Sequence, residues 1–160
     1  MKPVGPILAI ALALALTPHQ LVAVDQEPLD FTQPRSASFE PGRKAVQAKD
    51  FKAAIEHLTK AARETPNDAD VHNLLGYSYR KLNQFEKAME HYRRALNIDP
   101  NHRGAHEYIG ELYLEMGQLA NAERQLQALY RACPWFGRCE EHEELKEAIE
   151  KYKAKVKTRG

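Results

Sequence analysis

Residues 69–102 read ADVHNLLGYSYRKLNQFEKAMEHYRRALNIDPNH. Apolar side chains recur at helical spacing in two stretches, one on either side of Asn83. Asparagine tolerates the left-handed backbone conformation that commonly ends a helix, and Pro100 stops the second stretch. Just before the segment, Asn67 and Asp68 offer side-chain oxygens that can cap the first stretch. The segment therefore predicts a helical hairpin.

The features of this hairpin recur every 34 residues. Because a single hairpin cannot bury its apolar faces alone, we expect the units to stack. They span residues 35–68, 69–102 and 103–136. The period relates prolines (Pro66, Pro100, Pro134), glycines (Gly42, Gly76, Gly110), alanines (Ala54, Ala88, Ala122) and large apolar residues (Leu58, Tyr92, Leu126).

The chain beyond the repeats divides into three further predicted parts. Residues 139–157 carry one apolar stripe with glutamates at the start and lysines at the end, which complements a helix dipole and predicts a capping helix. Residues 24–38 contain Pro28 and Pro34 and are predicted to be a linker. Residues 1–23 are predicted to be a signal peptide.

The signal prediction depends on an uncharged run of 13 residues, Val4–Leu16, that follows Lys2. This run is short for crossing a bilayer but suits the apolar region of a secretory signal. A small residue at Ala23 places the expected cleavage after it, and a retained membrane anchor is the alternative. A periplasmic or secreted protein is expected.

Removal of residues 1–23 deletes one basic residue, Lys2, and leaves 22 Lys and Arg against 22 Asp and Glu. A neutral chain has no electrostatic footprint for nucleic acid. We therefore expect a protein or peptide partner, no nucleic acid, and no membrane contact after cleavage.

The second unit is similar to the tetratricopeptide repeat consensus through Leu75-Gly76, Tyr79, Ala88, Tyr92, Ala95 and Pro100. The resemblance implies an all-α fold, a right-handed α-solenoid of three hairpin repeats plus the capping helix. It also implies an interaction scaffold that is not an enzyme. The first unit departs from the consensus at Pro41 and Ala45, so its first helix is expected to be short and to start near Pro41.

In the tetratricopeptide family the first helix of each hairpin lines the concave surface. The resemblance therefore implies a groove for a partner segment, in which tyrosines supply rigid apolar area and Asn73 and Arg80 hydrogen-bond an extended backbone. The alternative is that Tyr77 and Tyr108 only pack between repeats. The lysine and asparagine clamp for a C-terminal carboxylate is not matched, because Leu74, Gly104 and Tyr108 occupy those positions. The predicted groove residues are Asn73, Tyr77, Arg80, Glu107, Tyr108 and Glu111.

Cys133 and Cys139 are the chain's two cysteines, six residues apart. In an exported protein such a pair predicts a disulfide. The alternatives are a metal site with His142 as third ligand, which would make the protein a periplasmic thiol or metal carrier, or a redox-active pair.

No motif for catalysis or for a cofactor is present, so catalytic residues, a cofactor and a metal site are not expected. His57 and His91 share one repeat position, as do His72 and His106, and equivalent positions lie about 10 Å apart, too far to share a metal. The row Glu107, Glu111 and Glu115 lies on one helix face, either toward the groove or in solvent.

Overall fold

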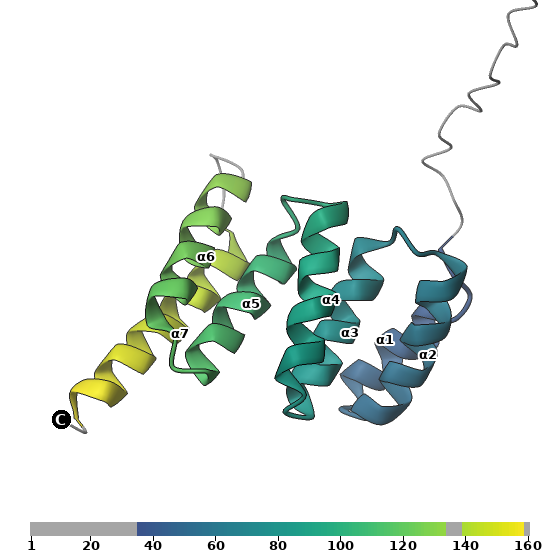
Figure 1. The fold of residues 1–160 in the computed structure, drawn as a ribbon, viewed down its shortest axis with the longest axis horizontal. Helices are drawn as coiled ribbons and strands as arrows, with labels where there is room; N and C mark the ends of the chain where they lie inside the picture. The colour runs from purple at the N-terminus through teal and green to yellow at the C-terminus, as the bar shows by residue number, and fades with distance from the viewer. Residues whose placement is uncertain (1–34, 134–138, 159–160) are drawn as a thin grey trace, which may run out of the picture. The chain divides into compact units, whose positions relative to one another are not determined.

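The computed structural model describes residues 35–133 and 139–158, and the predicted signal peptide and most of the predicted linker lie outside them. The described residues form helices without strands, so the predicted all-α repeat fold is confirmed (Figure 1). None of these helices combines the length and apolar character needed to cross a bilayer. The helices are α1 (Phe39–Gln47), α2 (Phe51–Glu64), α3 (Ala69–Lys81), α4 (Phe85–Ile98), α5 (Arg103–Glu115), α6 (Leu119–Ala132) and α7 (Glu140–Lys157).

The turn inside each hairpin uses one residue with left-handed backbone geometry. Asn83 (φ 58°) and Gly117 (φ 74°) adopt it, as predicted. Lys49 adopts it in the first hairpin, with a φ of 60°, although lysine gains no special freedom there. The three positions are 34 residues apart, so the turn geometry follows the repeat even where the residue type does not favour it.

Side chains cap the helices at several starts. The Asp68 carboxylate accepts from the Val71 backbone N–H at 3.2 Å, as expected for the Asn67-Asp68 pair, and Asp50 accepts from Ala53 N–H at 3.0 Å. At α5 the cap is a histidine, because Nδ1 of His102 accepts from the Ala105 N–H at 3.1 Å. Each cap satisfies a backbone donor that the helix itself leaves free.

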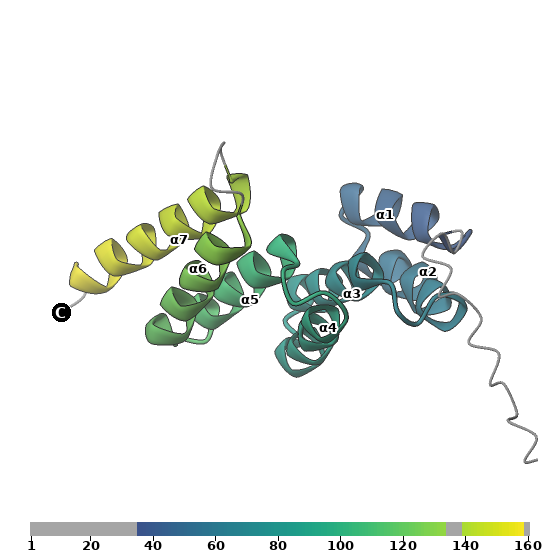
Figure 2. The same cartoon turned by 90° about the horizontal axis from the view of Figure 1, so that it is seen from above.

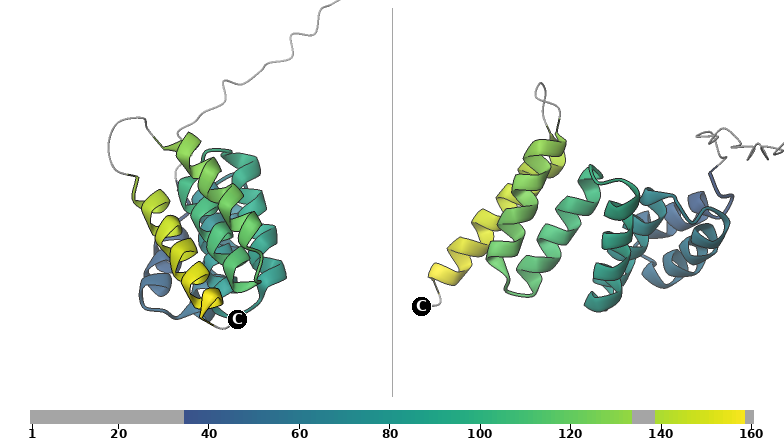
Figure 3. Two further views of the ribbon diagram at one scale, coloured as in Figure 1. Left: turned by 90° about the vertical axis from the view of Figure 1, so that its left-hand side faces the viewer. Right: turned by 45° about the horizontal axis from the view of Figure 1, so that its top comes forward.

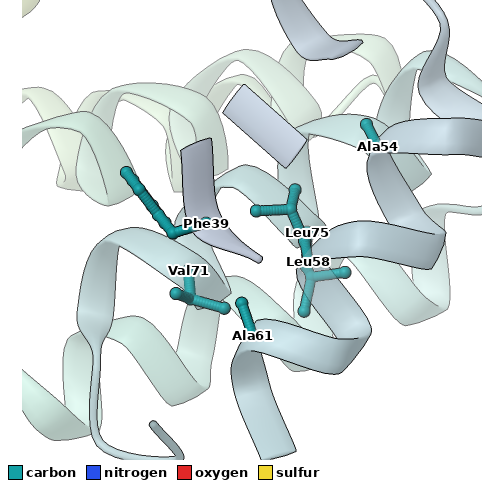
Figure 4. Close-up of a cluster of buried hydrophobic side chains, with 6 residues drawn as sticks. All are labelled: Phe39, Ala54, Leu58, Ala61, Val71 and Leu75. Atoms are coloured by element: carbon teal, nitrogen blue, oxygen red, sulfur yellow. The ribbon is translucent and has the colours of Figure 1, made fainter. Parts of the chain in front are cut away.

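The core of the first hairpin continues into the second (Figure 4). It holds Phe39, Ala54, Leu58, Ala61, Val71 and Leu75, from α1, α2 and α3. A Cβ built on Gly42 would lie 2.6 Å from Leu58 Cγ, and one built on Gly76 would lie 2.5 Å from Tyr92 Cδ1. Glycine therefore lets the two helices of these hairpins touch.

Gly110 departs from this rule. The repeat register predicts that Gly110, like Gly76, lies where the two helices of its own hairpin touch, but a Cβ on Gly110 would lie 2.5 Å from Leu145 Cδ2 of α7. Helix α7 packs against both α5 and α6, and runs alongside α6 in Figure 3. Leu126, the repeat equivalent of Tyr92, is only partly buried, because Leu145 of α7 takes the contact with Gly110. The predicted contact partner of Gly110 was therefore wrong: the glycine contacts the capping helix and not the second helix of its own hairpin.

The first repeat is short at its start. Helix α1 has nine residues and begins at Phe39, close to the predicted start near Pro41. The last residues of the predicted linker are not free of the repeats: Ser36 is buried and donates to Glu64, and Arg35 pairs with Asp70 at 2.6 Å. The linker prediction is therefore wrong for residues 35–38, whose side chains anchor the chain to the ends of α2 and α3.

Seen from above, α1 and α7 lie to the same side of the row made by α3 and α5 (Figure 2). The first helices of the hairpins and the capping helix thus form one continuous side of the stack. The predicted groove residues belong to two of these first helices, α3 and α5.

Candidate functional site

The predicted groove residues come from two neighbouring helices, α3 and α5, and we call them together the α3–α5 face: Asn73, Tyr77, Arg80, Glu107, Tyr108 and Glu111. Its centre is an aromatic pair, since the ring centroids of Tyr77 and Tyr108 are 5.0 Å apart. Phe51 of α2 extends the pair, with its ring edge-on to Tyr77 at 6.0 Å. Both tyrosines remain partly exposed, so the rings offer surface in addition to packing between repeats.

Arg80 holds the two helices together under these rings. Its side chain is only 4% exposed, and Nη1 lies 2.5 Å from Oε2 of Glu111. Nε lies 3.2 Å from Oε1 of Glu115, an ion pair without hydrogen-bond alignment. The guanidinium carbon is 5.8 Å from the ring centroids of both Tyr77 and Tyr108. Arg80 was predicted to hydrogen-bond the backbone of a partner. Its guanidinium is instead buried and paired with these two carboxylates, so its role in the α3–α5 face is structural.

Asn73 is 7% exposed, and its Oδ1 atom has no hydrogen-bond partner among the described residues. Its Nδ2 atom lies 3.0 Å from the position a Cβ of Gly104 would take. The absence of a side chain at Gly104 thus makes room for the carboxamide. A buried, unpaired carbonyl oxygen costs about 1–3 kcal/mol, so Asn73 is a group that an added donor would stabilise.

Glu107 is covered by the capping helix and is 5% exposed. Burial, a hydrogen bond with Glu144 of α7 and the nearby Glu111 raise its pKa to about 9. The burial of Glu107 therefore favours the neutral form of its carboxyl. The glutamate row of α5 is not simply a solvated face, since Glu107 turns toward α7 while Glu111 and Glu115 turn toward Arg80.

Glu144 was not among the predicted site residues. It lies 37 residues after Glu107, outside the 34-residue period, so alignment of the chain with itself could not place it. The excess of glutamate at the start of the capping helix was the available signal, but that excess also fits a helix dipole.

The histidines play a packing role. Nδ1 of His72 shares a hydrogen bond of 3.2 Å with Nδ1 of His91, and Nε2 of His72 lies 3.2 Å from the Pro66 carbonyl oxygen. His106 repeats this arrangement, with Nε2 3.0 Å from the Pro100 carbonyl and Gln125 in the place of His91. Each of these histidines thus ties the end of one hairpin to the start of the next. No group of three metal-ligating side chains occurs in residues 35–133 or 139–158.

Cys133 ends α6 and Cys139 precedes α7. Their Sγ atoms are at bonding distance and their Cα atoms are 5.9 Å apart, a separation typical of disulfides. His142 lies 3.3 Å from a Glu143 oxygen through Nδ1 and has its ring 6.2 Å from that of Tyr130. The pair thus has the geometry of a disulfide, a form in which neither sulfur is a thiolate.

A separate hollow of about 930 Å³ lies between α4 and the turn from α5 to α6. None of the predicted residues lines it, and its charged lining is mixed in sign. The lining includes Phe85, Glu86, Met89, Glu90, Arg93, Arg94, Tyr113 and Met116.

The stacked hairpins and the half-exposed aromatic face define an α-helical repeat scaffold, a class that typically binds other proteins and carries no catalytic machinery. The sequence profile described as tetratricopeptide repeat matches residues 69–102. One repeat of this family is thus matched in sequence, and the described helices have the fold of tetratricopeptide repeat domains.

Solved structures agree with this fold. The chain resembles the TPR2B domain of yeast Sti1, in a complex with an Hsp70 peptide, with 19% identity, a TM-score of 0.67, and coverage of 74% of this chain and 94% of that one. The Sgt2 TPR domain of Aspergillus fumigatus has 23% identity, a TM-score of 0.64, and coverage of 77% and 80%. The first TPR domain of Spaghetti (RPAP3), bound to the HSP90 peptide SRMEEVD, has 17% identity, a TM-score of 0.63, and coverage of 74% and 90%. No curated protein sequence matches the chain.

Proposed function

We propose that this protein is a scaffold that docks an extended segment of a partner protein on its α3–α5 face. The observation that carries the proposal is the aromatic pair of Tyr77 and Tyr108, 5.0 Å apart and backed by the buried Arg80. Tyrosine offers a large and rigid contact area with little loss of side-chain entropy, and such residues dominate binding at protein interfaces.

The surroundings of the pair favour an extended ligand. Ion pairs with Glu111 and Glu115 hold Arg80 in place, so the two tyrosine rings next to it are packed against a fixed side chain before a ligand binds. Preorganisation lowers the entropy that binding must offset. The unpaired Oδ1 of Asn73 lies on the same helix, four residues before Tyr77, and is an acceptor for which a backbone N–H of the ligand is a suitable donor.

Two of the similar structures hold peptides of the chaperones Hsp70 and HSP90. The HSP90 peptide, SRMEEVD, is acidic at its end. In this chain Leu74, Gly104 and Tyr108 stand where relatives of that kind have cationic and amide groups for a terminal carboxylate. We therefore propose an internal segment as ligand, and not a chaperone tail.

Site-specific photo-crosslinking in the producing cell tests the docking proposal. A photoreactive amino acid at Lys81, whose ammonium lies 5.0 Å from the Tyr77 ring centroid, is expected to capture a partner protein. The same amino acid at Glu150, exposed on α7, is the control. The crosslink should disappear when Tyr77→Ala and Tyr108→Ala are combined. A crosslink that survives this double change would overturn the proposal.

We also propose that the chain is exported, to the periplasm or outside the cell. The support is the Lys2 and Val4–Leu16 pattern together with a cysteine pair at disulfide distance, which is common in oxidising compartments. The intact mass of the protein from the producing cell should lack about 23 residues. A full-length cytosolic product would contradict export without affecting the docking proposal.

The thiol or metal carrier does not gain support from this geometry, because the two sulfurs bond to each other and His142 pairs with Glu143. Free-thiol counting on the mature protein decides between the two. The scaffold predicts none without reductant, whereas the carrier predicts two that disappear when metal binds.

A further inference from the structure

The hollow between α4 and the turn from α5 to α6 takes no part in the proposed docking, and one continuous face of α4 lines it. The residues of this face form two rows with a spacing of four, so each row lies along one side of the helix. We call this surface the α4 groove. One row holds Phe85, Met89 and Arg93, and the other holds Glu86, Glu90, Arg94 and Ile98.

The charges of the α4 groove are ordered along the helix. Glu86 and Glu90 come first, and Arg93 and Arg94 follow. All four side chains are exposed, and none of them forms an ion pair with another described residue. Glu90 and Arg94 stand four residues apart, a spacing that permits an ion pair within a helix, yet the structure does not form it. The groove therefore offers two carboxylates and two guanidinium groups to a partner.

The helix dipole does not account for this order of charges. The dipole acts on charges in the first and last turns of a helix. Of the acidic residues, Glu86 alone lies in the first turn of α4, and the last turn holds no basic residue.

The repeat does not account for the order either. The equivalent positions of α2 hold Lys52, Glu56, Thr59 and Lys60, and those of α6 hold Ala120, Arg124, Gln127 and Ala128. Among the second helices of the three hairpins, α4 alone has an acidic half followed by a basic half.

We propose that the α4 groove is the contact surface between two copies of this chain. The copies pack α4 against α4 in antiparallel directions, about a two-fold axis that passes between Glu90 and Arg93. The acidic half of each helix then faces the basic half of the other. Glu90 of each copy faces Arg93 of the other, so the same ion pair forms twice, and Phe85 faces Ile98 at both ends of the contact.

A second copy fits because a two-fold contact needs a surface that is complementary to itself. The ordered charges of α4 meet this need in the antiparallel arrangement, whereas a parallel one would place carboxylates against carboxylates. Apolar area lies beside the charges, since Phe85 and Met89 are partly buried and Met116 is 43% exposed. Burial of this apolar area favours association, while the charges fix direction and register.

The α4 groove shares no residue with the α3–α5 face. Figure 2 shows α3 between α4 and α1, so α4 lies away from the side that α1 and α7 share. Self-association through α4 therefore leaves the α3–α5 face open, and the inference does not depend on the docking function.

Sedimentation velocity of the protein isolated from the producing cell tests the inference. The average mass is expected to rise from that of a monomer toward that of a dimer between about 1 and about 200 μM, because contacts between exposed charges are weak. Salt at about 1 M should weaken the association at least tenfold through screening. A monomeric mass over the whole range would overturn the inference and leave the groove to a different partner.

Charge reversal tests the antiparallel register. Glu90→Arg and Arg93→Glu, each alone, place like charges opposite each other twice in the dimer, so each is expected to weaken self-association at least tenfold. A mixture of the two single variants should form a dimer again, because every reversed charge then faces an opposite one. Glu56→Arg, at the equivalent and exposed position of α2, is the matched control and should leave the association unchanged.

Recovery on mixing would also show that both variants are folded, and thermal unfolding of each checks this independently. A dimer that Glu90→Arg does not weaken, or two folded variants that do not associate when mixed, would overturn the α4 contact. The photo-crosslink at Lys81 reports on the α3–α5 face, so the two proposals can fail separately.

Discussion

Gly110 of α5 faces Leu145 of α7 so closely that a Cβ on the glycine would lie 2.5 Å and 2.6 Å from the two δ carbons of the leucine. Contact at this range leaves no space for even one methyl group. The glycine position of the third repeat therefore serves the capping helix, whereas in the first two repeats it serves the hairpin.

Gly110→Ala is expected to lower the free energy of unfolding by about 1–3 kcal/mol through overpacking. Amide exchange of α7 should become faster than that of α1 to α4, as hydrogen exchange with mass spectrometry can show. Combining the change with Leu145→Ala should cost less than the sum of the single changes, because the second removes the obstructing side chain. Strict additivity would mean that the two residues are not in contact.

Arg80→Met is expected to destabilise the stack by about 1–3 kcal/mol, because it leaves Glu111 and Glu115 without the cation that they share. Both carboxylates keep some access to water, which limits the loss. Arg43→Met removes an exposed ion pair to Glu40 and serves as the matched control, with a smaller expected change because water screens an exposed pair. Equal melting temperatures for the two variants would show that the buried pair contributes no more than a surface one.

Acidification should weaken the contact between α3 and α4 at His91, whose ring stacks on His72 and Tyr79. Burial, and then the neighbouring His72, lower the pKa of His91 from 6.5 to about 4. The unfolded chain therefore binds a proton between these pH values that the folded chain does not, so the stability present above pH 6.5 is lost as pH falls toward 4.

His91→Gln copies the third repeat, where Gln125 accompanies His106. Melting temperatures at pH 7 and pH 5 should differ less in this variant than in the unaltered protein. His57→Gln, at the equivalent position of the first repeat, is the control and should leave the difference unchanged. An unaltered pH dependence in His91→Gln would place the titrating group elsewhere.

Replacing both Cys133 and Cys139 by serine should loosen the junction between α6 and α7. Closing so short a loop contributes about 2 kcal/mol by the chain-entropy estimate. Faster exchange is expected in α7, with α3 and the Tyr77 contact to the partner unaffected. Loss of partner binding with an intact α7 would instead make the cysteines part of the functional site.

The fold was predictable from sequence because repetition supplies its own alignment. The hairpin contact is predictable because Gly42 recurs as Gly76, and each glycine faces a large residue of the second helix, Leu58 or Tyr92. The turns are predictable because Asn83 and Gly117 tolerate a positive φ. Lys49 takes the same geometry without any such preference, so only its position in the period identifies it.

The candidate site was less predictable because its contacts cross from repeated to unrepeated parts of the chain. Spacing placed Tyr77, Arg80 and Tyr108 on one side but could not show that Arg80 is held internally by Glu111. Glu107 is buried next to α7, a helix that lies outside the 34-residue repeats. The angle at which α7 packs on α5 is not determined by residue spacing, so this contact could not be predicted.

The predicted disulfide between Cys133 and Cys139 also gives the protein an optical reporter of its own. Trp135 is the single tryptophan of the chain, and its sequence position lies inside the covalent ring that this bond closes. Disulfides quench tryptophan emission at short range, so a rise in Trp135 emission on addition of a reductant would report the opening of this ring. One fluorimeter can then follow the redox state of the cysteine pair in an unlabelled sample.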